Sequence, residues 1–156
     1  MEPAWQKIKL LKLEATASPL WFMASDYVPG ARLLRITVVD KDENKATVGT
    51  TWSPISGTNC GPDGVTTSAT KSGLLTGGAL YGALIGKLGG SSADVPDASS
   101  ATGPYGTKRV FAVGSHCVIS LANTDAGPLF FTMNDAPSGF GQHSGTLHIL
   151  LEEYPT

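Results

Sequence analysis

The 156-residue sequence has few charged side chains and only two cysteines. Charged residues make up 15% of the chain, against about a quarter in an average globular domain, and eleven basic residues nearly balance thirteen acidic ones. No concentrated basic patch is present, so we expect no nucleic acid partner, because nucleic acid binding normally needs such a patch. Cys60 and Cys117 lie far apart in the sequence, and we expect both to remain thiols in a reducing cytoplasm.

Long apolar runs are also missing. No segment approaches the roughly 18 apolar residues that a membrane-spanning helix needs. Residues 1–15 lack the continuous apolar core and the small-residue cleavage pattern of a secretory signal. The sequence therefore predicts no membrane span, and a protein that is cytoplasmic or is exported without a classical signal peptide.

Apolar residues, glycine and proline are well represented. The chain is 41% apolar and contains 19 glycines and 10 prolines. The apolar content is enough for a folded core, and the length suits one domain over residues 1–156. Frequent glycine and proline are typical of a turn-rich β protein rather than a helical one.

Several stretches have the alternating apolar and polar residues, or the aromatic and β-branched residues, that are typical of strands. The clearest is Ala31 to Val39, which follows a turn at Pro29 and Gly30. The predicted strands are residues 9–16, 31–39, 83–88, 108–113, 116–121, 129–134 and 145–152. Their number and short spacing predict an all-β fold, an antiparallel β-sandwich.

Two other stretches do not read as strands. Residues 74–85 are the best helix candidate, but each glycine inside a helix costs about 1 kcal/mol relative to alanine, so the helical signal is poor. Residues 89–106 are rich in Ser, Ala, Gly and Pro and are predicted to form a long flexible surface loop. The functional alternative is that this loop forms the rim of a binding site.

The strongest local pattern lies between residues 129 and 151. A strand runs into Asn134 and Asp135, a compact loop turns on a proline and two glycines, and a second strand leaves from Gly145. This places a carboxylate, backbone carbonyls and amide side chains on one loop. Calcium takes six to eight oxygen ligands in such settings, and a bound calcium can accept two sugar hydroxyls as its last ligands.

This region resembles the bacterial calcium-dependent galactose-binding lectins, the PA-I galactophilic lectin family. The matching residues are Asn134, Asp135, Pro137, Gly141, Ser144 and Gly145, with Gly82 to Gly89 and the Gly61-Pro62-x-Gly64 turn upstream. The similarity extends over most of residues 15–153. It implies a galactose-binding-domain or jelly-roll type of sandwich and a non-catalytic lectin that binds sugar at the loop end.

The resemblance also implies which residues form the site. The implied calcium ligands are Asp135, Gln142, His143 and the carbonyls of Gly139 and Ile55, and the implied sugar-contacting residues are Asp135, Ala136, Gln142, His143 and Ser68. The sequence departs from the family at two amide ligands, which are replaced by Gln142 and His143. A histidine offers nitrogen, which calcium accepts poorly, so the calcium ligand set is altered.

Other interpretations of these residues remain open. Asp135 suits an ordinary turn as well as a ligand site, and with His143 it suits zinc or nickel better than calcium. Trp21 and Trp52 are expected in the core, whereas Phe140 at the loop tip is the best candidate for an exposed aromatic side chain that stacks on a sugar ring.

An enzyme is not expected. Ser144, His143 and Asp135 supply the residue types of a hydrolytic triad, but no Gly-x-Ser-x-Gly nucleophile elbow is present. The leading hypothesis is a carbohydrate-binding lectin, and because single sugar sites bind weakly, we expect a homo-oligomer. The alternative is a structural or protein-interaction module that has lost sugar and metal binding.

Overall fold

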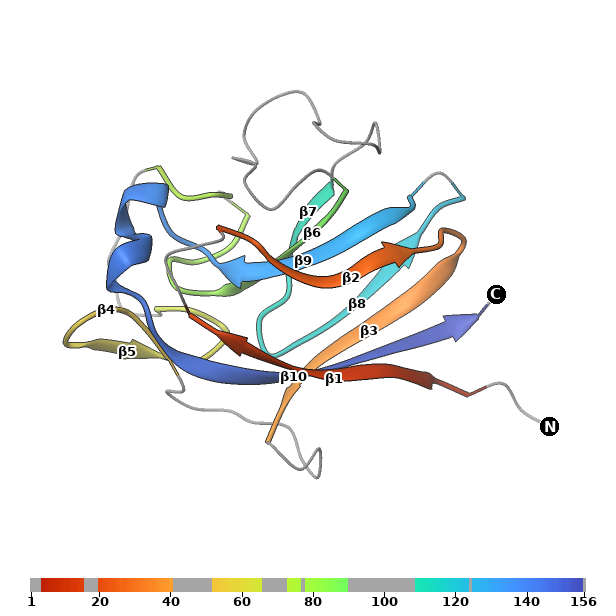
Figure 1. Ribbon diagram of the computed structural model, residues 1–156, viewed down its shortest axis with the longest axis horizontal. Helices are drawn as coiled ribbons and strands as arrows, with labels where there is room; N and C mark the ends of the chain where they lie inside the picture. Colours follow the sequence, from red (N-terminus) through yellow and green to blue (C-terminus); the bar gives the residue numbers. More distant parts are fainter. Residues whose placement is uncertain are drawn as a thin grey trace.

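The computed structural model describes residues 4–15, 20–40, 52–65, 73–76, 78–89, 109–123 and 125–155. These residues form two antiparallel β-sheets packed face to face, as Figure 1 shows. The six-stranded sheet contains β1 (Gln6–Glu14), β3 (Arg32–Val39), β4 (Trp52–Ile55), β5 (Thr58–Cys60), β8 (His116–Leu121) and β10 (Ser144–Pro155). The four-stranded sheet contains β2 (Phe22–Val28), β6 (Leu84–Leu88), β7 (Arg109–Ala112) and β9 (Gly127–Met133). The short 3-10 helix η1 (Pro137–Gln142) joins β9 to β10.

Strand β10 holds the six-stranded sheet together. Its first two residues pair with β4, and the rest of the strand pairs with β1 and with β3. The strand order is β5-β4-β10-β3-β8, with β1 also on β10, and the four-stranded sheet has the order β2-β9-β6-β7. Because β1 begins where β10 ends, at the right of Figure 1, the connection from β9 to β10 lies at the opposite end of the sandwich.

The main core lies between the two sheets. In a strand, every second side chain points to the same face, and the buried apolar residues follow this period. They include Leu34, Ile36 and Val38 of β3, Leu147, Ile149 and Leu151 of β10, and, from the facing sheet, Leu129, Phe131 and Met133 of β9. The alternation that predicted the strands is therefore the alternation that fills this core.

A second core covers the outer face of the four-stranded sheet. Its buried members are Trp21, Leu75, Ile85, Phe130 and Phe140. Strands β6 and β9 are thus buried on both faces, which explains their nearly continuous apolar sequences.

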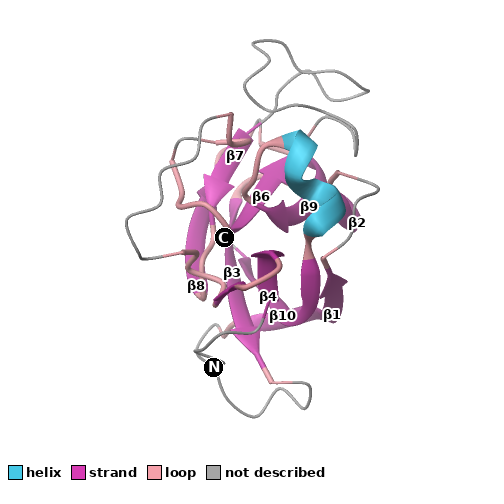
Figure 2. Cartoon of the chain, turned by 90° about the vertical axis from the view of Figure 1, so that its left-hand side faces the viewer, coloured by secondary structure: helices cyan, strands magenta, loops and turns pink. Residues whose placement is uncertain are grey.

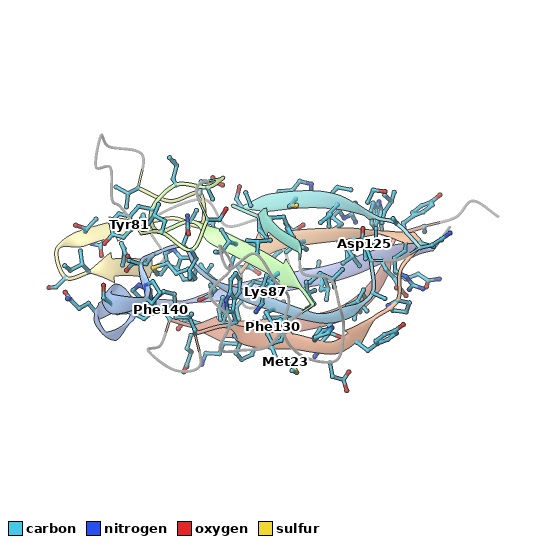
Figure 3. The ribbon with its side chains drawn as sticks, turned by 90° about the horizontal axis from the view of Figure 1, so that it is seen from above. Met23, Tyr81, Lys87, Asp125, Phe130 and Phe140 are labelled. Carbon is cyan, nitrogen blue, oxygen red and sulfur yellow. The ribbon has the colours of Figure 1, made fainter. Side chains whose placement is uncertain are left out.

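Lys87 of β6 belongs to this buried outer face. Its side chain is fully buried, and its Nζ atom lies 4.8 Å from the ring centroid of Trp21 and 4.7 Å from that of Phe130. Figure 3 shows Lys87 and Phe130 in the middle of the sheet. The two aromatic faces offset part of the cost of burying the ammonium group.

The observed strands agree well with the predicted ones in the part of the chain that the structure describes. Strand β8 has the predicted bounds, and β3, β6 and β10 differ from the prediction by a few residues. Strands β2, β4 and β5 were not predicted. The described part of residues 74–85 contains no helix, in keeping with its glycine content. The predicted loop 89–106 lies outside the described residues, apart from Gly89.

Cys60 is buried and Cys117 is half-buried, and neither forms a disulfide. Over the described residues, we find no helix that is both long enough and apolar enough to cross a membrane. Trp21 and Trp52 lie in the core, which confirms the expectation from the sequence.

Candidate functional site

Three segments meet at the end of the sandwich where β9 passes into β10. They are η1, the β4–β5 hairpin, and residues 73–82 as far as these are described, and they lie at the left of Figure 1 and face the viewer in Figure 2. Ser144 and Gly145 pair with Ser53 and Trp52, which fixes the start of β10 against β4. The predicted site residues that the structure describes fall on this end, which we call the loop end.

Asn134 ties residues 76–82 to the end of β9. Its side chain is fully buried, and its Oδ1 atom accepts a hydrogen bond from the backbone N–H of Thr76 at 3.1 Å. Its Nδ2 atom donates to the carbonyl oxygens of Thr76, Ala79 and Leu80 at 3.0, 2.9 and 3.2 Å. One side chain thus satisfies backbone groups that have no sheet partner there.

Asp135 and His143 form a buried pair across the loop. The Oδ2 atom of Asp135 lies 2.8 Å from Nε2 of His143, and the two side chains are 0% and 1% exposed. A carboxylate can only accept, so the Nε2–H group of His143 donates this hydrogen bond to Asp135. The other oxygen, Oδ1, accepts a hydrogen bond from the backbone N–H of Ala136 at 2.7 Å. The pair links the end of β9 to the start of β10.

Phe140 packs against this pair and is not exposed. Phe140 is only 3% exposed. The centroid of its ring lies 4.4 Å from that of the His143 ring, and the two ring planes meet at 45°. The expectation of an exposed aromatic at the loop tip is therefore wrong. The physical reason is that the loop folds as η1, which turns Phe140 inward onto the second core, where it meets Trp21 and Leu75.

The other predicted site residues differ in accessibility. Gln142 at the end of η1 is exposed, and Ile55 in the β4–β5 hairpin is 37% exposed. Ala136 is half-buried and Gly139 is buried. Ser68 lies outside the described residues. The fold therefore places Asp135, Ala136, Gly139, Gln142, His143 and Ile55 at one end of the sandwich, with Gln142 and Ile55 at the surface.

The described parts of the three loop-end segments expose polar but uncharged side chains, and exposed carboxylates flank them at Asp63, which follows the hairpin, and at Glu14, which pairs with Thr146. Residues 52–61, 73–76, 78–82 and 134–145 contain no Lys, Arg or Glu, and the single Asp, Asp135, is buried. The exposed side chains here are hydroxyls, amides and apolar groups, two of them large: Ile55, Ser56, Asn59, Leu80, Pro137, Ser138, Gln142 and Ser144. This surface suits a neutral ligand that is rich in hydrogen-bonding groups.

The donors at the loop end fit calcium poorly. Both carboxylate oxygens of Asp135 already accept N–H hydrogen bonds, and His143 directs a protonated nitrogen at one of them. The carbonyl oxygen of Ile55 lies 2.5 Å from the hydroxyl of Ser53. Among the described residues, no three His, Cys, Asp or Glu side chains gather closely enough to hold a metal ion together. In that part of the chain, Asp135 and His143 therefore have no third side chain of these types with which to hold zinc or nickel.

Sequence reasoning missed how strongly Asn134 and the segment from Thr76 to Leu80 shape this end. Asn134 was recognised as part of a motif, but its role as the anchor of a distant segment was not. The position of Asn134 carried a signal that could have indicated this role. Asn134 directly follows the buried apolar run of β9, and a buried amide needs several hydrogen-bond partners.

We compared the chain with known proteins. No protein-family model matches the sequence, and no curated protein matches it. A solved structure described as "EclA N-terminal domain; PllA-like lectin" is similar in fold, with a TM-score of 0.57 and 13% sequence identity, and the match covers 97% of this chain and 98% of that one. The fold of this chain is therefore a β-sandwich like that of a PllA-like lectin domain.

Proposed function

We propose that this protein is a non-catalytic carbohydrate-binding module whose ligand binds at the loop end, over η1 and the β4–β5 hairpin. The observation that carries the proposal is the uncharged, hydrogen-bonding surface around Gln142 on a sandwich frame similar to a lectin domain. A neutral sugar presents hydroxyls that both donate and accept, together with C–H faces that pack on apolar groups.

The exposed side chains match these requirements. The amide of Gln142 can donate and accept at once, and the hydroxyls of Ser138 and Ser144 can do either. Ile55 is 37% exposed and offers an apolar contact beside them. The backbone beneath these groups is hydrogen-bonded to β4 and within η1, and such preorganisation reduces the entropy lost on binding. Galactose-type sugars are the specific class that the sequence resemblance supports.

The buried Asp135–His143 pair resembles half of a hydrolytic triad, which makes an enzyme the natural second candidate. The imidazole side chain is only 1% exposed, however, and packs on Phe140, so no substrate reaches it in this arrangement. A general base must lie within hydrogen-bond reach of the proton that it removes. We therefore propose a binding role and not hydrolysis for this loop.

A single sugar site of this kind binds modestly, so we also propose that the protein acts as a homo-oligomer with several sites. Linking sites raises avidity by about 10²–10⁴ without any new contact. Sedimentation analysis of the purified protein measures the assembly, and a monomer at all concentrations would contradict this part of the proposal.

A glycan array tests the function. The array is probed with the wild-type protein, with Gln142→Ala, and with Gln6→Ala as a matched control at the other end of the sandwich. We expect a signal on neutral glycans that falls at least tenfold for Gln142→Ala and is unchanged for Gln6→Ala. The absence of any glycan signal would overturn the proposal and favour a protein-interaction module.

A further inference from the structure

The loop between β9 and β10 is closed by its own side chains. Asp135 lies two residues after the end of β9, and His143 lies immediately before the start of β10. Their hydrogen bond therefore joins the two ends of the loop across η1. A bound cation would have this same structural task if Asp135 were its ligand.

Asp135 and His143 each make further contacts that fix their side chains in place. Oδ1 of Asp135 is fixed by the N–H of Ala136, and the backbone carbonyl of Asp135 accepts a hydrogen bond from Leu75 at 3.1 Å. The imidazole of His143 lies against Phe140, whose ring is anchored in the second core. A cation could reach Asp135 only by displacing His143 and disturbing this packing.

Two neighbouring oxygens that could serve as ligands, both of Asn134, are also engaged. The amide oxygen of Asn134 accepts from Thr76, and its backbone carbonyl accepts from Gly82 at 2.8 Å. Calcium requires six to eight oxygens, and Asp135 is the single carboxylate in the described parts of the loop between β9 and β10, the β4–β5 hairpin and residues 73–82.

We infer that His143 takes over the bridging task of a cation, so that this loop folds without calcium and binds its ligand without calcium. The statement on ligand binding rests on the proposed function, whereas the statement on folding does not. The Asp135–His143 hydrogen bond is thus a built-in closure of the site.

Thermal unfolding in calcium and in chelator tests the inference. A calcium ion present at a hundred times its Kd would raise the Tm by roughly 5–10 °C for a domain of this size. We expect a shift of less than about 1 °C for the wild-type protein, within the scatter of such scans. Stabilisation by calcium, and not by magnesium, would overturn the inference.

Variants of the pair give a second, independent test. We expect His143→Asn to lower the Tm by roughly 10 °C in chelator, and Asp135→Asn to add little further loss, because the two residues act together. His116→Asn, at an exposed histidine of β8, is the matched control and should change the Tm little. A His143→Asn variant as stable as the wild type would show that the imidazole does not hold the loop.

The glycan array separates this inference from the proposed function. Equal glycan signals in calcium and in chelator would support both. A signal only in calcium would overturn the inference and keep the function. No signal in either condition, with an unchanged thermal response to calcium, would overturn the function and leave the folding part of the inference standing.

Discussion

The side chain of Asn134 and the backbone of Thr76 exchange two hydrogen bonds, at 3.1 and 3.0 Å. The amide accepts from the backbone N–H of Thr76 and donates to its carbonyl oxygen, as a residue of a neighbouring strand would. Two further carbonyls, of Ala79 and Leu80, are bound by the same amide nitrogen. The loop end therefore depends on one buried residue for the position of a segment that lies more than fifty residues away in the sequence.

Replacing Asn134 with alanine should strongly destabilise the protein. The change leaves several buried backbone groups without partners, and we expect the free energy of unfolding to fall by about 3–5 kcal/mol. Asn59→Ala is the matched control, because Asn59 is exposed at the same end, and it should change stability by less than about 0.5 kcal/mol. Urea denaturation measures both, and equal effects would refute the role given to Asn134.

Gly30 lies where the β2–β3 turn approaches residues 122 and 123. A Cβ atom at Gly30 would lie 2.5 Å from the carbonyl oxygen of Ala122 and 2.7 Å from that of Asn123. Because these atoms belong to the backbone, Gly30→Ala should cost about 2 kcal/mol. Gly141→Ala, where a Cβ meets nothing within 4 Å, should be nearly neutral. Thermal unfolding of the two variants compares the effects, and a stable Gly30→Ala would contradict the turn geometry.

Arg35 and Glu152 form a bidentate ion pair between β3 and β10, with N–O distances of 2.8 and 2.9 Å. The hydrogen bonds from Arg35 to Glu152 raise the pKa of the guanidinium group. We expect Glu152→Gln to cost about 1 kcal/mol, because the pair is well aligned and partly buried.

Glu14→Gln is the control for that variant, because the Lys12–Glu14 pair is more exposed. It should change the free energy of unfolding by a few tenths of a kcal/mol at most. The difference between the two variants should narrow as salt is added, since salt screens charge pairs. Urea titrations at low and high salt measure the free energy of unfolding of both variants. A larger loss for Glu14→Gln than for Glu152→Gln would contradict the assignment.

The two cysteines should differ in reactivity. Burial raises the pKa of the Cys60 thiol, an effect only partly offset by the side chain of Trp52. The thiolate is the reactive form, so a raised pKa slows alkylation at about pH 8. We expect iodoacetamide to label the half-buried Cys117 first in the native protein and both cysteines after unfolding, as peptide mass spectrometry would show. Faster labelling of Cys60 in the native protein would contradict its burial.

The strands with clear alternation could be predicted from the sequence, because burying one face of a strand imposes a period of two on its residues. Strand β3, with Leu34, Ile36 and Val38 buried, is the clearest case. Strand β2 was missed because its exposed residues include the large apolar Phe22, Met23 and Tyr27, which hide the alternation. Strands β4 and β5 are only four and three residues long, too short to carry a periodic signal.

The candidate site could be located from the sequence but not described. The order Asn134, Asp135, Pro137 predicted a connection between two strands, and the structure shows these residues between β9 and β10. The burial of Asp135 against His143 depends on how η1 packs onto a second core, and that core includes Trp21 and Leu75, which are distant in sequence. Such tertiary packing leaves no local pattern.

The most direct test of the proposed site is a titration of ¹⁵N-labelled protein with the glycan that gives the strongest array signal, followed by backbone amide chemical shifts. We expect saturable shifts at Gln142, Ser144 and Ile55, at the loop end, and none at Asn123, near the opposite end of the sandwich. Saturable shifts confined to residues away from η1 and the β4–β5 hairpin would contradict the proposed site.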